Sequence, residues 1–240
     1  MLMRSLSIRD SVRQLFRYFR GTVVRPSTTF EALASERSVR WAVMLTCLPV
    51  LQVWGNIALH AAFGLDWLGT RPMLSDPTFV AGFGHLRIGL ANWVPVFAAL
   101  MPLLVLLGLV IIPGVVQLMS KRWQGQGTFE QMFNAMAFAI IVPNMVIGAT
   151  SEWLFSVPMD LIYGHPYWWN AAMQGEFGPV IGRMWNLYVF GIYIGFQYGW
   201  QIFLGSTAIR RIQKIPAWAA VLIMFVAFAV SMFVESVFVR

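Results

Sequence analysis

Polar side chains that can form hydrogen bonds or carry charge occur at intervals inside apolar stretches of this chain. They are Gln52, Asn56, His60, Asn134, Asn144, Glu152, Tyr193, Gln197, Gln201 and Glu235. The first three recur every fourth residue, as do Tyr193, Gln197 and Gln201, and this spacing places side chains on one face of a helix. Because a polar group facing hydrocarbon has no water to bond to, we expect these faces to point into a bundle of helices.

Two interpretations of these polar rows differ in chemistry. In the first, the side chains form hydrogen bonds between helices, which contribute roughly 0.6 kcal/mol per contact on average. In the second, they line a path for a substrate, an ion or a proton, since ionisable residues within membrane spans mark such paths. The first is favoured, because the only acidic residues in the rows, Glu152 and Glu235, lie near the outer, water-facing ends of their stretches.

Residues typical of catalysis or metal binding are few. His60, His85 and His165 fall on one predicted side of the membrane, but their spacing matches no metal-ligand motif. Cys47 and the serines lie in no nucleophile motif, and the segment 125–127 lacks the strand and the lysine of a phosphate-binding loop. We therefore predict no enzyme activity, no catalytic residue, no cofactor and no metal. A metal or redox enzyme built on the histidines is the alternative.

The composition places these residues in a membrane protein. The 240 residues are 58% hydrophobic and 11% charged, with a mean hydropathy of +0.67, more apolar surface than one soluble core of this size could cover. Five stretches are long enough to cross about 30 Å of hydrocarbon. They lie near 41–63, 93–119, 129–155, 181–208 and 217–238. The predicted fold class is an all-α integral membrane bundle of five transmembrane helices, preceded by a cytoplasmic amphipathic helix.

Positive charge sets the orientation of these stretches. With the N-terminus inside, thirteen of the 17 Lys and Arg residues fall in inner segments and four in outer ones. This asymmetry predicts an inner-membrane protein with a cytoplasmic N-terminus and an extracytoplasmic C-terminus. The organisation is an N-terminal cytoplasmic or interfacial segment over 1–40 and a five-span domain over 41–240. Because the net charge of +7 lies beside the apolar stretches, it indicates anionic lipid as a partner and no nucleic acid.

The segment 5–20 has the pattern of an amphipathic helix. One face carries Ile8, Val12, Leu15, Phe16 and Phe19, and the other positions carry Arg9, Arg13, Arg17 and Arg20. At a membrane surface, each of these arginines would contribute about 1 kcal/mol by contact with anionic phosphates. A helix packed on the cytoplasmic ends of the spans, or on a partner protein, fits the same pattern equally well.

The segment 121–131 predicts a cytoplasmic hairpin between the second and third spans. Gly125 and Gly127 allow a tight turn, and Thr128 with Gln131 has the spacing of a capping box, in which each side chain bonds a backbone N–H at a helix start. The hairpin is therefore expected to end where a new helix begins.

Two further local patterns concern helix starts and helix packing. Thr28 and Glu31 repeat the capping-box spacing just before the first span, which predicts that a short helix begins at Thr28. Gly191, Gly195 and Gly199 recur every four residues in the fourth span. Such a ridge of small residues lets another helix approach closely, so it is predicted to be a helix-packing surface.

Four short segments share a pattern with a known family. They are Val24–Phe30 before the first span, Gly125–Gln131 in the hairpin, Ala135–Ala139 with Pro143 after it as a predicted kink, and Gly195–Ile209 before the last span. Together they resemble the Yip family of polytopic membrane proteins, the Ypt/Rab-interacting proteins, and specifically its bacterial branch. The resemblance covers most of residues 20–238 and implies five spans with a cytoplasmic N-terminus.

The resemblance also bears on function. Eukaryotic members are linked to small GTPases and vesicle traffic, but their Asp-Leu-Tyr-Gly-Pro signature is absent, and the loosely similar segment 160–164 falls on the opposite side of the membrane. Bacterial relatives look like accessory subunits of membrane complexes. We therefore expect a non-catalytic accessory or scaffold subunit that binds other integral membrane proteins through its spans, and a homo-oligomer is compatible with this. The alternative is a transporter or lipid-handling protein with a polar intramembrane cavity.

Overall fold

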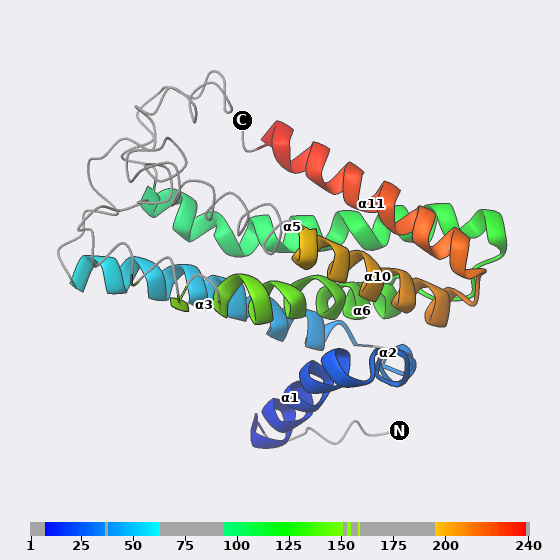
Figure 1. The fold of residues 1–240 in the computed structure, drawn as a ribbon, viewed down its shortest axis with the longest axis horizontal. Helices are drawn as coiled ribbons and strands as arrows, with labels where there is room; N and C mark the ends of the chain where they lie inside the picture. The colour runs from blue at the N-terminus through cyan, green and yellow to red at the C-terminus, as the bar shows by residue number, and fades with distance from the viewer. Residues whose placement is uncertain are drawn as a thin grey trace, which may run out of the picture. The chain divides into compact units, whose positions relative to one another are not determined.

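The computed structural model describes residues 8–36, 38–62, 94–150, 153, 154, 158 and 195–238 (Figure 1). In chain order the elements are α1 (Ile8–Val24), α2 (Pro26–Ala34), α3 (Arg40–Ala62), α5 (Val94–Ser120), the 3₁₀ turn η2 (Lys121–Trp123), α6 (Phe129–Pro143), the π-helix η3 (Asn144–Ala149), α10 (Gln197–Gln213) and α11 (Ala217–Phe238). No strand occurs among these residues. The predicted all-helical class is confirmed.

Apolar helices occupy the predicted spans wherever the structure describes them. The bounds of α3, α5 and α11 lie within one residue of the predicted ranges. Within the described residues, two segments are long and apolar enough to cross a membrane, Leu106–Trp123 and Phe129–Ala149, and a shorter apolar helix covers Ala217–Ser231. Five membrane crossings therefore stay a prediction.

The fourth predicted span differs from the prediction at its C-terminal end. Its first residues, up to 194, lie outside the described residues. The helix continues to Gln213 rather than ending at 208, and Arg210 and Arg211 form its last turn. Cationic side chains stabilise a helix C-terminus, and Lys214, at a φ of 55°, then takes the left-handed conformation that often follows a helix. The helix therefore runs five residues beyond the predicted end of the span.

Pro143 marks a change of helix type in the third span. The α-helical hydrogen bonds of α6 end there, and the next six residues form the π-helix η3. A proline has no N–H to donate to the carbonyl four residues earlier, so the regular ladder is interrupted at the position where a kink was predicted. π-Helical turns inside α-helices frequently mark functional positions.

The start of α2 corrects one predicted helix boundary. The helix begins at Pro26, and no side chain caps its first turn. The Thr28 hydroxyl donates to the Arg25 carbonyl at 3.0 Å instead of bonding a backbone N–H. A proline needs no N–H partner at the first helical position and has its φ preset for a helix, so Pro26 starts the helix two residues before the predicted cap.

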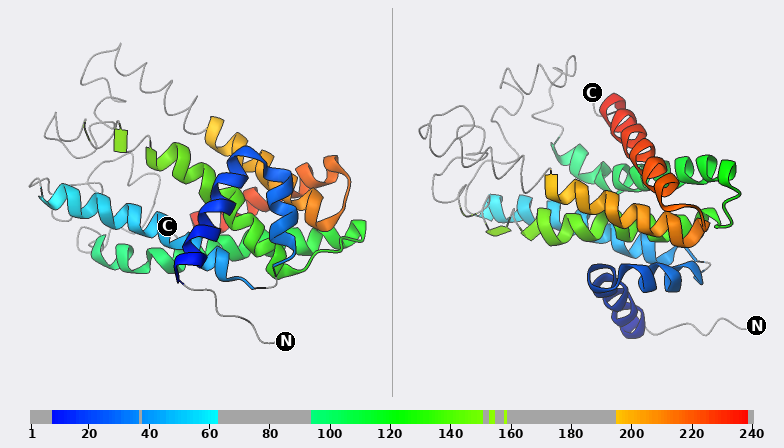
Figure 2. Two further views of the ribbon diagram at one scale, coloured as in Figure 1. Left: turned by 90° about the horizontal axis from the view of Figure 1, so that it is seen from below. Right: turned by 45° about the vertical axis from the view of Figure 1, so that its right-hand side comes forward.

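The chain packs as two compact units. Unit 1 contains Met1–Cys47, Leu106–Pro143 and Trp200–Ser231, and unit 2 contains Leu48–Val105, Asn144–Gly199 and Met232–Arg240. In unit 1, α1 and α2 contact each other and both contact α6 (Figures 1 and 2). The N-terminal helices are therefore part of the packed bundle of unit 1.

The connection between α5 and α6 closes over Gln213, at the end of α10 in unit 1. The N–H of Gly127 donates to Gln213 Oε1 at 3.1 Å, and Gln213 Nε2 donates to Gln117 Oε1 at 2.9 Å. Gln117 Nε2 in turn donates to the Gly127 carbonyl at 2.9 Å. Because Gln213 is only 1% exposed, this hairpin network of Gln117, Gly127 and Gln213 satisfies an amide that water cannot reach.

The hairpin needs glycines at positions 125 and 127 because a side chain there would clash, not because the backbone takes a left-handed φ. The left-handed residue of the turn is Gln124, at a φ of 56°. A Cβ at Gly127 would lie 2.5 Å from Ile212 Cγ2 and 3.0 Å from Gln213 Nε2, and one at Gly125 would overlap Gln213 Oε1. The predicted tight turn is present, but its glycines are required because α10 approaches the backbone closely.

The predicted capping box at the start of α6 is confirmed. The Thr128 N–H donates to Gln131 Oε1 at 2.9 Å, and the Gln131 N–H donates to the Thr128 hydroxyl at 3.4 Å. Gln131 Nε2 also donates to the carbonyl of Ala34. The same side chain therefore caps α6 and ties it to the last residue of α2.

Two glycine substitutions test the hairpin contact. Gly127→Ala should lower the thermal unfolding midpoint of the detergent-solubilised protein. The new methyl group would push the side chains of Ile212 and Gln213 away from the hairpin, at a cost of about 1–3 kcal/mol. Gly114→Ala, at a helical position where no described atom beyond its own turn of helix lies within 4 Å of the added Cβ, should leave the midpoint unchanged or raise it. Equal midpoints for the two variants would show that the approach of α10 to the hairpin is not close.

Candidate functional site

The structure places the side chains of five predicted polar-row residues. Asn134, Gln197 and Gln201 are buried, with exposed fractions of 0%, 4% and 3%, and Gln52 and Asn144 are half-buried. These five side chains thus turn wholly or partly toward the protein interior. The remaining candidates lie outside the side chains that the structure describes: Asn56, His60, His85, Glu152, His165, Gly191, Tyr193 and Glu235.

Asn134 joins α6 to the start of α3 in unit 1. Its Oδ1 accepts from the N–H of Ala42 at 3.1 Å, and its Nδ2 donates to the carbonyl of Ser38 at 2.6 Å. The first N–H groups of a helix have no partner within the helix, so a side chain from α6 here caps α3. The Ser38 hydroxyl adds a second cap by accepting from the Arg40 N–H at 3.3 Å.

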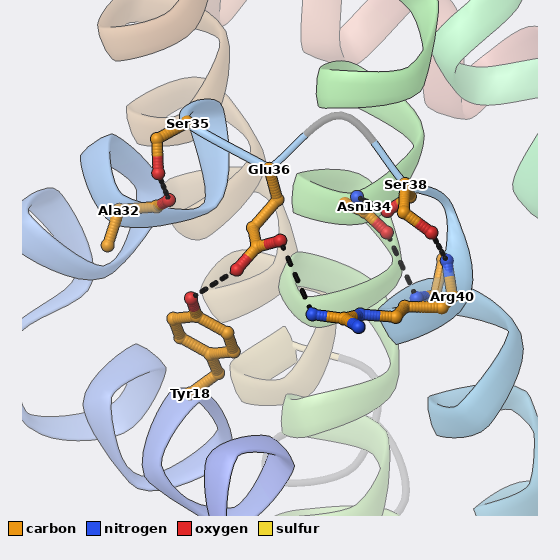
Figure 3. A network of polar contacts seen from close by, with 8 residues as sticks. Tyr18, Ala32, Ser35, Glu36, Ser38, Arg40 and Asn134 are labelled. Atoms are coloured by element: carbon orange, nitrogen blue, oxygen red, sulfur yellow. Dashed lines mark hydrogen bonds and ion pairs between the residues drawn. The ribbon is translucent and has the colours of Figure 1, made fainter. Parts of the chain in front are cut away.

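A second set of contacts, around Glu36, holds α1 against the same corner (Figure 3). The Tyr18 hydroxyl donates to Glu36 Oε1 at 3.1 Å, and Arg40 approaches Glu36 Oε2 at 3.7 Å. The Tyr18 ring packs edge-on against Trp41 and Phe138, with centroids 5.6 and 6.0 Å away. Burial, reinforced by the nearby Glu36 carboxylate, raises the pKa of Tyr18 above its usual 10.0, so the hydroxyl stays a donor at neutral pH.

In unit 2, Gln197 and Asn144 bring two predicted rows together. Gln197 Nε2 donates to Asn144 Oδ1 at 3.0 Å. Gly148 lies beside them in the π-helix, where a Cβ would be 2.8 Å from Asn144 Oδ1 and 3.3 Å from Gln197 Oε1. Gln197 Oε1 itself is buried and has no hydrogen-bond partner in the described part of the chain. This amide pair retains an unused acceptor.

Gln201 is held separately, in unit 1. Its Nε2 donates to the carbonyl of Ile140 at 3.1 Å, three residues before Pro143. Its Oε1 is buried without a partner among the residues described. The side chain therefore bonds the backbone of α6 close to the point where its helical ladder is interrupted.

The four arginines predicted to meet lipid, Arg9, Arg13, Arg17 and Arg20, are all exposed on α1. The buried face of the helix instead carries Tyr18 and Thr22, which turn toward unit 1. Two residues of the predicted apolar stripe, Val12 and Phe16, stay 52% and 70% exposed. Thus α1 packs on α2 and α6 along one edge and leaves another apolar edge open, while contact of its arginines with lipid stays a prediction.

The predicted glycine ridge is exposed where it is described. Gly195 and Gly199 are both accessible, and none of the described atoms would lie within 4 Å of a Cβ at Gly199. The closely packed glycine of α10 is Gly205, where a Cβ would overlap the side chain of Met224 on α11. No helix of the described residues packs on Gly199, so helix packing at the ridge stays a prediction.

Sequence reasoning missed the hairpin network. Gln117 and Gln213 lie outside the recurring rows and each sits near a charged segment, so both look like surface residues. The sequence signal that could have predicted the network was Gln117, a glutamine at the end of an apolar run and close to a hairpin with two glycines. Among the described residues, no group of three His, Cys, Asp or Glu side chains is placed to hold a metal ion.

Comparison with known families bears on this arrangement as a whole. A family model described as the Yip1 domain matches residues 20–238. The chain belongs to the Yip1 domain family. The predicted resemblance is confirmed, while assignment to the bacterial branch stays a prediction. The Yip1 domain includes Asn134 and the hairpin network, and most of α1 precedes it. Neither the curated proteins nor the solved structures compared with the chain contain a match.

Removing the Asn134 amide tests its role in joining α3 to α6. Asn134→Ala should destabilise the folded protein by about 2–3 kcal/mol, because it leaves a buried N–H and a backbone carbonyl unpaired. Gln126→Ala removes an exposed amide of the hairpin and should cost less than about 0.5 kcal/mol. Thermal unfolding in detergent compares the two, and a loss for Asn134→Ala as small as that of the control would contradict the assignment.

Proposed function

We propose that this Yip1-domain protein is a non-catalytic accessory or scaffold subunit of the inner membrane. The observation that carries the proposal is that two buried side-chain amides form all their hydrogen bonds with other residues of the same chain. Asn134 and Gln213 each have both polar side-chain atoms paired with other residues of unit 1. Interior amides that are fully paired favour helix packing over a path for a polar substrate.

The outward faces of the helices support binding to other membrane proteins. Phe203 on α10 and Trp218, Phe225 and Phe233 on α11 are 53–70% exposed. In a bilayer, such faces are covered by lipid or by a partner helix. Gly199 lies on the open side of α10, and small residues allow the close backbone approach that joins transmembrane helices.

The basic residues of unit 1 support a cytoplasmic N-terminus. The hairpin and the end of α10 present exposed cationic side chains next to apolar helices. These residues are Lys121, Arg122, Arg210, Arg211 and Lys214. Because α1 and its arginines pack in the same unit, a single cytoplasmic side accounts for all of them.

Blocking the open face of α10 tests partner binding. Gly199→Leu should abolish or strongly reduce the co-purification of partner membrane proteins in mild detergent, read by mass spectrometry, because the added side chain prevents close helix approach. Folding should be preserved, since the position is open. Gly114→Leu, at another open helical glycine outside the ridge, is the matched control. A wild-type monomer with no co-purifying protein would refute the scaffold proposal.

The second candidate is a transporter or lipid-handling protein, and one observation favours it. Gln197 Oε1 is buried and unpaired among the described residues, beside Asn144 and the π-helix η3. An unused acceptor within a span is what a polar substrate or a file of water would require. The Asn144–Gln197 pair is the place where such a cavity would begin.

Water access separates the two candidates. In a Cys47→Ala background, which removes the single native thiol, Gln197→Cys should react with a charged, membrane-impermeant thiol reagent only if the site is wet. The scaffold proposal predicts a rate no higher than that of Leu204→Cys, a fully buried position of α10. Labelling of Gln197→Cys at a rate near that of Gln126→Cys, an exposed position of the hairpin outside the predicted spans, would favour the transporter.

A further inference from the structure

A groove of about 1100 Å³ lies between α1 and α2, on the surface of unit 1. Five arginines line it, Arg9, Arg13, Arg17, Arg20 and Arg25, and its lining contains no Asp or Glu. Its volume is slightly above the range of about 300–1,000 Å³ typical of ligand pockets. We name this feature the α1–α2 groove.

The corner between the two helices is tightly built. A Cβ at Gly21 would overlap the Thr29 hydroxyl, so α1 and α2 meet more closely than a side chain would permit. The Arg25 N–H donates to the Gly21 carbonyl at 2.7 Å, and the hydroxyls of Thr28 and Thr29 both donate to the Arg25 carbonyl at 3.0 Å. The groove is therefore set by fixed backbone contacts.

The charge of the groove is not neutralised within the described chain. None of its five arginines is ion-paired with a carboxylate of the residues described, and the nearby Glu31 bonds Arg211 at 2.8 Å. The start of α2, which opens beside Arg25, carries no acidic residue in its first turn and no capping side chain. An anion in the groove would lie between guanidinium groups one turn apart on α1, and one placed near Arg25 would also meet the positive end of a helix dipole.

The α1–α2 groove also has apolar lining residues, and these favour an anion that carries an apolar chain. Val12, Phe16 and Val24 line it and are 52%, 70% and 62% exposed. A free phosphate would leave these side chains in water, whereas a phospholipid offers them an acyl chain and offers the arginines a phosphate. The helix also packs, through Tyr18, on Trp41 in the first turn of α3, where the first predicted span begins. That contact puts the groove near the headgroup level of a membrane.

We propose that the α1–α2 groove binds one acidic phospholipid of the cytoplasmic leaflet. The lipid phosphate bonds the guanidinium groups of Arg13 and Arg17, the other three arginines of the groove attract it at longer range, and one acyl chain lies along Phe16 and Val12. The inference rests on the cytoplasmic, membrane-facing placement of α1 in the proposed function, but it requires no protein partner. It makes α1 a receptor for a single headgroup instead of a diffuse basic surface.

Native mass spectrometry of the purified full chain tests this proposal, with phosphatidylglycerol and phosphatidylcholine of identical acyl chains as probes. Arg13→Gln/Arg17→Gln should weaken binding of the first phosphatidylglycerol by about 30-fold, with little effect on phosphatidylcholine. Lys121→Gln/Arg122→Gln removes the same charge from the hairpin and should change the affinity by less than about 2-fold. Phe16→Ser should weaken lipid binding, whereas Leu118→Ser, equally exposed outside the groove, should not. All these positions are exposed, so the unfolding midpoints should stay close to wild type.

Several outcomes would overturn the groove assignment. An equal loss of phosphatidylglycerol affinity in Arg13→Gln/Arg17→Gln and in Lys121→Gln/Arg122→Gln would mean general charge attraction. Displacement of the lipid by excess glycerol phosphate would mean a site for free phosphate esters. Unchanged lipid binding, with loss of a co-purifying protein in Arg13→Gln/Arg17→Gln, would mean a protein docking site. A groove that fails these tests in a protein that still captures partners through Gly199 would leave the scaffold proposal intact.

Discussion

A buried amide in an apolar interior has no water to bond to, so a polar atom left without a partner there costs free energy. Unit 1 depends on this constraint. Asn134 meets it by bonding the start of α3, and Gln213 meets it by bonding the hairpin and Gln117. Gln131 extends the same pattern from the start of α6 to the end of α2. Because each bond joins elements distant in sequence, the amides fix how the helices of unit 1 are arranged around α6.

The position of α1 follows from that arrangement. Asn134 holds the first turn of α3, which presents Trp41 to the Tyr18 ring, and Glu36 accepts the Tyr18 hydroxyl. Once this edge of α1 is buried, its arginines and the side chains of Val12 and Phe16 are left on the open side and line the groove beside α2. The polar contacts of the interior therefore lead to a charged groove on the surface, through a chain of packed residues in one unit.

The polar rows serve different purposes at different places. Asn134 is fully paired, whereas Gln197 and Gln201 each keep one buried acceptor without a partner among the described residues. The first arrangement suits a structural joint, and the second retains capacity for another hydrogen bond. The two unused acceptors belong to the residues near Pro143 and the π-helix, where the regular backbone ladder is interrupted. Family membership identifies a membrane protein and leaves the chemistry of these positions to be decided by experiment.

The sequence by itself determined the features that depend on neighbours within a few residues. Apolar runs of sufficient length became α3, α5 and α11, and the Thr128–Gln131 box started α6. The one local error, at α2, arose where Pro26 and Thr28 gave competing helix starts and the preset φ of proline prevailed.

Only the tertiary structure decided which amides pair, which glycines are close-packed and which edge of α1 is buried. Gln213 and Gln117 are 96 residues apart, as are Asn134 and Ser38. Such partners are brought together by packing, and no local pattern of residue types specifies them.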